Sequence, residues 1–502
     1  MPGGRDDAII GGEAEVGEEG EGGIVRWETL FRKVTVVDGS GAAGFTADVA
    51  LAGGRIAAVG PALEGAAAAV VEGAGRVLAP GFIDVHTHDD RAALAAATMR
   101  PKVSQGVTTV VVGNCGISLA PCPVPAGGAP IAPMTLLGKA EAFAYPRFAD
   151  YRRRVEQAPG PVNVAALVGH MTLRARAMAE LDRPASAAEI AAMRDDLAEA
   201  LEAGALGLST GLAYPPSRYA ATSEVIALAR DVAAAGRLHT THMRNEADGV
   251  IAAVAETIAI ARETGVRTLI SHHKCCGEGN FGLSATTLAM IAEARETLRI
   301  DLDVYPYTAS STVLLDRMVR ESRRVTLSWS DSHPEMAGRD LADVAAEWGC
   351  DEKAAVARLQ PAGAIYHQMD EADLLRILAF PPSLVGSDGL PHDKRPHPRL
   401  WGTFPRVLGR FVRERGLLTL EQAVAKMTGQ TAAVLGLAKR GLVRPGYHAD
   451  LVLFDPAAIL DRASYEDPEL AAVGIDCVLV NGEVTYEAGA MTGRLPGRFL
   501  AG

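Results

Sequence analysis

Six side chains that can bind a metal ion each stand directly after a short apolar run of the sequence: His86, His88, Cys115, His242, His272 and Asp388. His86 and His88 are two residues apart, so on a strand both imidazoles point to the same face and can reach one ion. Imidazole, thiolate and carboxylate are ligands that zinc prefers in proteins. One such residue alone is more often structural, but six of them at the ends of apolar runs predict a zinc site.

Eight apolar runs can form the strands that would position these side chains: residues 81–85, 108–112, 162–168, 205–209, 238–241, 268–271, 300–305 and 384–386. Ala-rich amphipathic segments lie between several of them and predict helices, among them residues 187–203, 223–235 and 250–264. Eight such βα units predict an α/β fold, the (β/α)8 TIM barrel. In that barrel the carboxyl ends of the strands meet around one pocket, which would bring the six side chains together.

Both ends of the chain predict a second, smaller unit made of strands. Short β-like runs occur at residues 31–37, 47–51 and 55–59, and again at 449–454, 476–480 and 483–486. Asn481-Gly482 joins the last two runs and is a strong hairpin signal. We therefore expect residues 24–78 and 441–502 to form a composite small β-domain beside a catalytic barrel of residues 79–440.

Two further segments stand apart from these units. Residues 1–23 are rich in Gly and Glu and are expected to be a disordered acidic tail. The gap between the seventh and eighth strands is too long for a simple connection, so we expect an insertion at about residues 312–373. Its place beside the strand ends makes it a candidate cover for the active site.

Composition excludes several classes of partner. The formal net charge is −12, from 49 basic and 61 acidic residues, so there is no basic surface for nucleic acid or for an anionic membrane. The sequence contains no apolar run long enough to span a bilayer and no Sec-type signal at its start, which predicts a cytoplasmic protein. Six cysteines in 502 residues do not suggest a disulfide framework. The oligomeric state cannot be predicted.

Several of these segments resemble a known family. Residues 79–88, Ala-Pro-Gly-Phe-Ile-Asp-Val-His-Thr-His, are similar to the first strand of the amidohydrolase superfamily. Residues 113–116 (Gly-Asn-Cys-Gly), 169–174, 241–246, 271–274 and 386–389 (Gly-Ser-Asp-Gly) resemble the N-acyl-D-amino-acid deacylases, or D-aminoacylases, in particular. Residues 445–455 resemble the composite β-domain of the superfamily. The resemblance covers about residues 30–500, and the Cys at position 115 is its most specific feature.

The resemblance implies a tightly bound zinc on Cys115, His242 and His272, with a water in the fourth position. His86, His88 and Asp388 would line a second, weaker zinc position that shares Cys115. His273 remains an alternative to His272, although strand alternation points it the other way. Many related enzymes bridge two metals with a carboxylated Lys on the fourth strand. Residues 205–211 contain no Lys, which argues against a hydantoinase-like or dihydroorotase-like enzyme and leaves the Cys115 thiolate as the bridging anion.

The remaining roles follow from the chemistry of amide hydrolysis. Asp388 is the expected general base, which takes a proton from a zinc-activated water and then returns it to the departing amine. An N-acyl amino acid also carries an α-carboxylate, and the matching family positions that would hold it here are Lys274, Tyr305, Ser311 and Arg399. Arg244, Asn245 and Glu246 are candidates to support His242.

The predicted reaction is the hydrolysis of N-acyl-D-amino acids, small-molecule substrates, to a carboxylate and a free D-amino acid. The preference for the D enantiomer rests on the resemblance alone. Two alternatives stay open within the enzyme class: a related amidohydrolase acting on N-acyl-D-glutamate or N-acyl-D-aspartate, and one acting on a dipeptide. A third is a non-catalytic scaffold that retains the fold, although such a protein should have lost some of the six side chains.

Overall fold

Eight parallel strands form a closed barrel in the computed structural model, which describes residues 26–124 and 128–502. The tail predicted for residues 1–23 lies outside the described residues. In barrel order the strands are β6 (Phe82–Asp84), β7 (Val107–Val112), β8 (Asn163–Ala166) continued by β9 (Val168–Gly169), β10 (Gly207–Gly211), β11 (Leu238–His242), β12 (Arg267–Ile270), β13 (Ile300–Val304) and β17 (Ser383–Val385). The predicted TIM barrel is confirmed.

The seam between the first and last strands of the barrel is closed just beyond the strands themselves. Thr87 pairs with Gly389 in a parallel bridge. The amide of Asp388 donates to the carbonyl oxygen of His86 at 2.7 Å, and the amide of His88 donates to that of Gly389 at 3.1 Å. The backbone that carries three candidate ligands is therefore the same backbone that completes the barrel.

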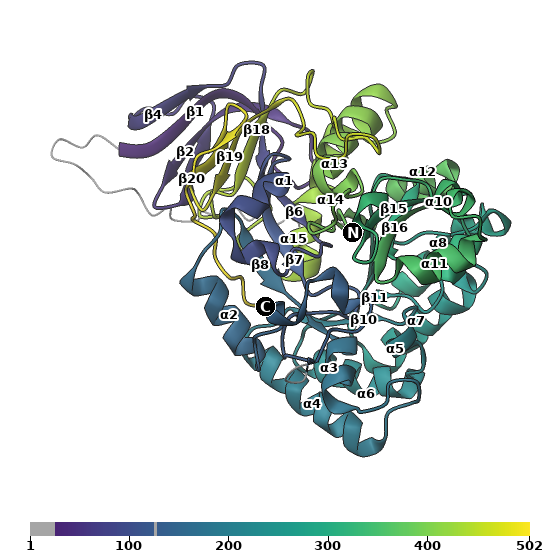
Figure 1. Cartoon of the computed structure of the whole chain (residues 1–502). Coiled ribbons are helices and arrows are strands. Elements are labelled where there is room, and N and C mark those ends of the chain that lie inside the picture. The colour runs from purple at the N-terminus through teal and green to yellow at the C-terminus, as the bar shows by residue number, and fades with distance from the viewer. Residues whose placement is uncertain (1–25, 125–127) are drawn as a thin grey trace, which may run out of the picture.

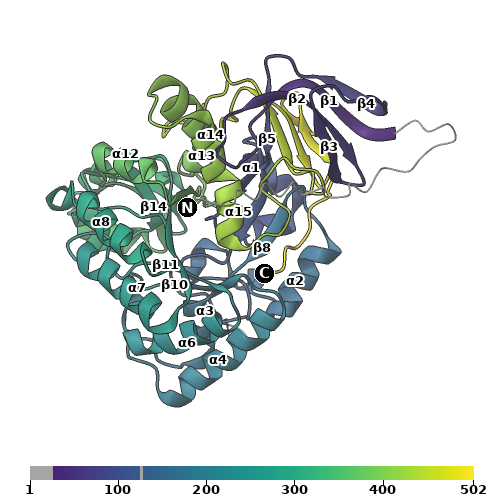
Figure 2. The same ribbon diagram turned by 180° about the vertical axis from the view of Figure 1, so that it is seen from behind.

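Helices surround the barrel: α1 (Arg100–Val103), α2 (Phe148–Gln157), α3 (His170–Ala177), α4 (Ala187–Glu202), α5 (Pro215–Arg218), α6 (Thr222–Ala234), α7 (Val250–Thr264), α8 (Ser284–Arg295), α12 (Glu371–Ala379), α13 (Arg399–Arg406), α14 (Leu420–Met427) and α15 (Gly429–Leu435). Their sequences explain their bounds. In α7, Val250, Val254, Ile258 and Ala261 recur at helical spacing and are buried, and Gly265 ends the helix with a left-handed φ of 70°. Figure 2 shows α3, α4, α6 and α7 along the outside of the barrel.

Strands from both ends of the chain form one nine-stranded sheet, which confirms the expected composite β-domain. The N-terminal strands are β1 (Arg26–Val36), β2 (Phe45–Ala52), β3 (Arg55–Gly60), β4 (Ala66–Glu72) and β5 (Val77–Pro80); the C-terminal strands are β18 (Leu451–Phe454), β19 (Ile475–Val480), β20 (Glu483–Glu487) and β21 (Ala490–Met491). Antiparallel pairing of β5 with β18 joins the two halves. Figure 1 shows purple strands from the start of the chain beside yellow strands from its end. Asn481 and Gly482, both with positive φ, form the predicted hairpin turn.

The connection between β13 and β17 holds the expected insertion. It contains a three-stranded antiparallel sheet of β14 (Ala309–Val313), β16 (Ala362–His367) and β15 (Arg324–Ser330), with helices α9 (Asp316–Arg320), α10 (Leu341–Glu347) and α11 (Glu352–Leu359). Leu327, Leu341 and Tyr366 belong to a separate hydrophobic cluster within it. Figure 1 shows it beside α8 and α12. In the described parts of the chain, no helix has the length and apolar character needed to cross a bilayer.

Candidate metal centre

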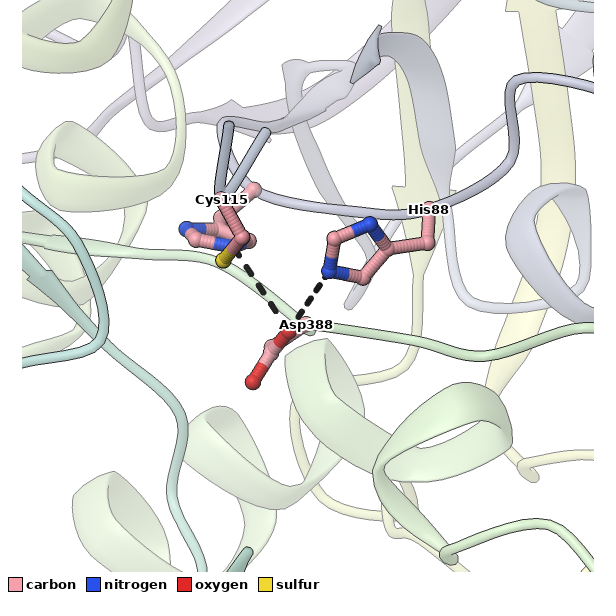
Figure 3. Close-up of side chains that lie close together, drawn as sticks. His88, Cys115 and Asp388 are labelled. Atoms are coloured by element: carbon pink, nitrogen blue, oxygen red, sulfur yellow. Dashed lines mark hydrogen bonds and ion pairs between the residues drawn. The ribbon is translucent and has the colours of Figure 1, made fainter. Parts of the chain in front are cut away.

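The six predicted ligands lie together at the carboxyl ends of the barrel strands, in two groups that share Cys115. One group contains His86, His88, Cys115 and Asp388, and the other contains Cys115, His242 and His272. Within each group, one ligand atom from every residue lies within 4.8 Å of the others, and all six residues are buried. Figure 3 shows the side chains of His88, Cys115 and Asp388 converging on one point.

Cys115 occupies the middle of this arrangement. Its Sγ lies 3.2 Å from His86 Nε2 and 3.3 Å from His272 Nε2, so one sulfur faces an imidazole of each group. Asp388 follows β17, the neighbouring strand across the seam, and its Oδ1 lies 3.3 Å from His88 Nε2 and 3.5 Å from His86 Nε2. The sulfur is therefore the atom best placed to bridge two neighbouring ions.

Two carboxylates hold the imidazoles that face Cys115. Asp303, on β13, places Oδ2 3.3 Å from His86 Nδ1, and Glu246 places Oε1 3.0 Å from His272 Nδ1. A carboxylate on one ring nitrogen fixes the tautomer and leaves the other nitrogen free to bind a metal. Glu246 was a candidate support for His242, and its Oε2 does lie 3.5 Å from His242 Nε2. Asp303 was not among the residues predicted from the sequence, because its only signal there is a carboxylate inside a predicted buried strand.

Three of the six candidate ligands have an uncommon backbone conformation. Cys115, His272 and Asp388 have φ angles of 53°, 36° and 49°, in the left-handed region that residues with a Cβ seldom adopt. Such strain costs roughly 1–3 kcal/mol per residue and is concentrated at functional sites. Around Cys115 the neighbouring glycine is required, because a Cβ on Gly116 would lie 2.7 Å from the amide nitrogen of Gly211.

A single hydroxyl fixes the loop that carries Cys115. Ser209 Oγ, on β10, donates to the carbonyl oxygen of Gly113 and accepts from the amide of Gly116 at 3.0 Å. The two contacts lie on either side of Cys115 in the sequence and hold both ends of the turn. The fourth strand, which lacks the Lys of related two-metal enzymes, thus contributes by positioning the thiol.

The charges of the site favour anionic forms of the thiol and the carboxylate. Burial opposes ionisation of Cys115, but His86 and His272 outweigh it and hold the pKa of the thiol well below its usual value. Burial likewise opposes ionisation of Asp388, but Arg399, followed by His88, holds the pKa of that carboxyl well below its usual value. Both groups are therefore ready to bind a cation.

The four predicted substrate-binding residues are Lys274, Tyr305, Ser311 and Arg399, and the two cations among them lie over the ring of Tyr305. The guanidinium carbon of Arg399 is 4.6 Å from the ring centroid, and Lys274 Nζ is 5.9 Å from it. Arg399 Nη1 lies 2.9 Å from Asp388 Oδ2, and its Nη2 donates to the carbonyl oxygen of Ser311 at 3.0 Å. Lys274 Nζ lies 2.7 Å from Glu246 Oε1. Both cations are thus paired with buried carboxylates next to the metal ligands.

Three other residues considered from the sequence lie outside the two ligand groups. His273 belongs to neither group, and its Nε2 lies 2.8 Å from Thr287 Oγ1. Arg244 pairs with Glu256, at 2.8 Å, and does not contact His242 in the described structure. Asn245 accepts hydrogen bonds from the amides of Ala247 and Gly249 and so closes its own turn.

The donor set fits zinc. It combines four imidazoles, one thiol with a lowered pKa and one ionised carboxylate, which match the preference of zinc for nitrogen, sulfur and carboxylate ligands. Nδ1 of His88 and Nδ1 of His242 are buried and have no hydrogen-bond partner among the described residues. Nε2 of each ring faces a carboxylate of the site, that of Asp388 for His88 and that of Glu246 for His242. A pocket adjoins the site, lined in part by His88, His272 and Asp388.

Comparison with known proteins places the chain in a family. A family model described as "Amidohydrolase family" matches residues 69–486. D-aminoacylase of Alcaligenes xylosoxydans xylosoxydans is 51% identical over 475 residues, which cover 95% of this chain and 98% of the relative. N-acyl-D-aspartate deacylase of the same organism is 49% identical over 94% of each chain.

A solved structure is equally similar. The crystal structure of N-acyl-D-glutamate deacylase from Bordetella bronchiseptica, complexed with zinc and a phosphonate mimic of the tetrahedral intermediate, matches with a TM-score of 0.92. The identity is 49%, over 95% of this chain and 100% of that one. Both the sequence similarity and the structural similarity extend over nearly the whole chain. The chain therefore belongs to the N-acyl-D-amino-acid deacylase family of the amidohydrolases.

Proposed function

We propose that the protein hydrolyses the amide bond of N-acyl-D-amino acids, with zinc as cofactor, to give a carboxylate and a free D-amino acid. The observation that carries the proposal is the pair of buried ligand groups sharing Cys115, beside two cations that face the same aromatic ring. The two ligand groups can hold the metal ion that metal-assisted hydrolysis needs. The two cations can bind the α-carboxylate of the substrate. Relatives with about half of their residues identical carry the names of such deacylases.

We assign the tight zinc position to Cys115, His242 and His272, and a second, weaker position to His86, His88 and Asp388 with the shared sulfur of Cys115. When bound, zinc would polarise the amide carbonyl and lower the pKa of a water. The carboxylates of Asp303 and Glu246 hold the imidazoles in the orientation that this binding needs.

Asp388 is the residue that we assign to proton transfer. Its Oδ2 contacts Arg399, whereas its Oδ1 faces His86 and His88 at the candidate metal position. A carboxylate in this position can accept a proton from the attacking water and then hand it to the amide nitrogen. The amine is a poor leaving group without that proton, so one residue serves first as base and then as acid.

Substrate binding is assigned to Lys274, Tyr305, Ser311 and Arg399. Tyr305 Oη and Ser311 Oγ are buried and lack hydrogen-bond partners in the described part of the chain. A buried hydroxyl without a partner costs free energy, which a substrate carboxylate would offset by accepting from both. Lys274 and Arg399 would supply the positive charge for the same carboxylate.

We further propose that the preferred substrates have uncharged side chains. The pocket beside the candidate metal ligands is lined in part by Leu136, Met318 and Leu390, and Lys274 is the only Lys or Arg among the described residues that line it. Because that ammonium already pairs with Glu246, it is poorly placed to bind a second, side-chain carboxylate. This supports the substrate class of the D-aminoacylases over N-acyl-D-glutamate and N-acyl-D-aspartate.

A survey of hydrolysis rates tests these proposals. We expect N-acetyl-D-leucine and N-acetyl-D-methionine to be cleaved faster than their L enantiomers and faster than N-acetyl-D-glutamate or N-acetyl-D-aspartate. An amidated substrate, which lacks the α-carboxylate, should be cleaved poorly. Equal rates for the amide would contradict the carboxylate-binding role, and faster cleavage of the acidic substrates or of a dipeptide would favour those alternatives. A purified protein that contains no zinc and shows no activity would favour the third alternative, a non-catalytic scaffold.

We also propose a cytoplasmic location. All six cysteines, which lie within the described residues, are free. The proposed site needs Cys115 in its reduced, unoxidised form, and a reducing compartment keeps cysteines reduced. Cell fractionation tests this assignment.

A further inference from the structure

We propose that Lys102 is a positioning residue of the metal centre. Its buried ammonium links the segment that carries His86 and His88 to the segment that carries Asp388, and so sets the geometry of the weaker zinc position. This inference rests on the proposed function for the identity of the metal ligands.

Lys102 lies on α1, and its side chain is 1% exposed. Its Nζ donates to Asp84 Oδ2 at 2.7 Å and to Ser387 Oγ at 2.6 Å, and it lies 3.3 Å from Asp89 Oδ2. A buried ammonium is costly unless its donors are satisfied, and here all three contacts are with oxygen atoms. The ammonium of Lys102 is therefore buried and has its hydrogen-bond donors satisfied by the protein.

The partners of Lys102 lie next to the candidate ligands in the sequence. Asp84 stands two residues before His86, Asp89 directly follows His88, and Ser387 directly precedes Asp388. Asp84 also accepts from the amide of Ser387 at 2.8 Å and from its hydroxyl at 2.6 Å. Lys102 therefore lies at the seam that closes the barrel and contacts residues of both the first and the last strand segments.

The charges at this seam depend on the ammonium. Burial lowers the pKa of Lys102, but Asp84 and Asp89 more than compensate, so the net pKa is raised and the group stays protonated. Without it, two buried carboxylates would face each other unneutralised. We expect them to move apart and to shift the segment that holds Asp388 in its left-handed conformation, with φ 49°.

The other zinc position should be spared. Of its ligands, Cys115 and His272 follow β7 and β12, and His242 ends β11. None of the three makes a hydrogen bond or ion pair with Lys102 in the described structure. The effect of removing Lys102 should therefore fall on one metal position only.

The chain offers a matched control in Lys426. This lysine is also buried, at 4% exposure, and its Nζ donates to the carbonyl oxygens of Phe380, Pro381 and Ser383. Ser383 begins β17, the strand whose other end leads to Asp388. Lys426→Met thus removes a buried ammonium from the opposite end of the same strand.

The experiment compares Lys102→Met, Lys102→Gln, Lys102→Arg and Lys426→Met with the unmodified protein. Zinc per chain is measured during titration with a chelator, alongside thermal unfolding and the kcat and KM for N-acetyl-D-methionine. We expect Lys102→Met and Lys102→Gln to keep the tight zinc, to bind the weaker zinc at least about tenfold less strongly and to lose about tenfold or more in kcat at nearly constant KM. Lys102→Arg should recover part of both losses, and Lys426→Met should lower only the unfolding temperature.

Three results would overturn the proposal. The first is unchanged binding of the weaker zinc in Lys102→Gln. This variant retains a hydrogen-bond donor and serves as the test if Lys102→Met fails to fold. The second is an equal change in zinc binding in Lys426→Met. The third is an unmodified protein that binds no second zinc. Because zinc binding is measured without substrate, these outcomes remain distinct from a failure of the proposed reaction, which would appear as an inactive but zinc-loaded unmodified protein.

Discussion

Cys115 is the side chain on which both candidate metal positions depend. Its sulfur faces His86 on one side and His272 on the other, at nearly equal distances. Its backbone is held in a left-handed conformation by contacts of Gly113 and Gly116 with Ser209. Loss of the anionic sulfur would take the one ligand atom that the two groups share.

Cys115→Ala should therefore remove most of the bound zinc and abolish activity, because it takes an anionic ligand from both positions. Metal analysis and initial rates on the purified variant test this expectation. Cys122→Ala is a suitable control, since Cys122 is a half-buried thiol outside both ligand groups and should be dispensable. If Cys115→Ala keeps the zinc content and the hydrolysis rate of the unmodified protein, Cys115 is a structural residue and the proposed metal ligands are wrong.

Asp388→Asn tests the proton transfer assigned to that residue. The tight zinc is assigned to Cys115, His242 and His272, so the variant should keep about one zinc per chain. General acid–base catalysis contributes about 10²–10⁴-fold, and one residue handles both transfers, so kcat should fall by about 10⁴-fold. Zinc analysis combined with steady-state kinetics separates the outcomes: near-normal turnover would assign the proton to another group, and loss of all zinc would make Asp388 a ligand of the tight position.

At the scale of secondary-structure elements, helices α3 and α6 are joined by a buried ion network. Glu224 of α6, 1% exposed, lies 2.9 Å from His170 Nε2, and its Oε2 accepts from Arg174 Nη1 at 2.7 Å. Burial raises the pKa of Glu224, but His170 and Arg174 outweigh it and lower the value to about 2. The amides of Met171 and Thr172, also on α3, donate to the carbonyl oxygen of Gly116, so this network supports the loop of Cys115.

Glu224→Gln should lower the free energy of unfolding by about 3 kcal/mol at pH 7, because it leaves the buried guanidinium of Arg174 without its anion. The pKa of Glu224 is depressed from 4.5 to about 2 in the folded protein. Its contribution is therefore fully present above pH 4.5 and is lost as the pH falls toward about 2. Urea unfolding of both proteins at pH 7 and at about pH 3 should show the difference shrinking.

The exposed pair of Glu180 and Arg183, at 3.7 Å, provides the control for that prediction. Because ion pairs in water contribute little, Glu180→Gln should leave the unfolding free energy nearly unchanged. If the two glutamine variants behave alike at pH 7, the buried network does not contribute the stability ascribed to it.

At the scale of the whole molecule, the nine-stranded sheet and the barrel share a polar junction. Asp450, just before β18, accepts from the side-chain amide of Asn163 on β8 at 3.3 Å and from the amide of Asn481 at 2.8 Å. It also forms a buried ion pair with Arg440. Val452 of the sheet and Phe82 of the barrel belong to one hydrophobic cluster, so the two parts are expected to unfold together.

Asp450→Ala should lower the free energy of unfolding by about 3–5 kcal/mol, because Arg440 would be left buried without its partner. Asn163 begins β8, whereas the candidate ligands lie at the carboxyl ends of the strands, so zinc content and KM of the folded protein should not change. Calorimetry and zinc analysis give both readouts. Asp455→Ala, which breaks the more exposed contact of Asp455 with Arg76, should cost much less. Loss of zinc in Asp450→Ala would mean that the junction and the metal centre are coupled.

The sequence by itself determined the barrel and the identity of the candidate ligands. Strand and helix periodicities are local, and a His-x-His or Gly-Asn-Cys-Gly segment at the end of an apolar run is visible without any partner. Local sequence patterns did not predict strands whose extended conformation depends on pairing with a distant strand. Strand β4 is an Ala-rich, mostly exposed segment that extends only because it pairs with β1, and its sequence carries no period-2 pattern.

Only the tertiary structure decided how the site is held and which charges face one another. Asp303 supports His86 across 217 positions of the chain, and Lys102 contacts Ser387 across 285. Arg399 could be placed near a substrate from the sequence, but its contact with Asp388 depends on where the tertiary structure places the first residue of α13. Such contacts arise between residues that are far apart in the sequence, and each side chain alone is compatible with many partners. The fold selects among those partners by burial, since a buried charge requires a counter-charge within reach.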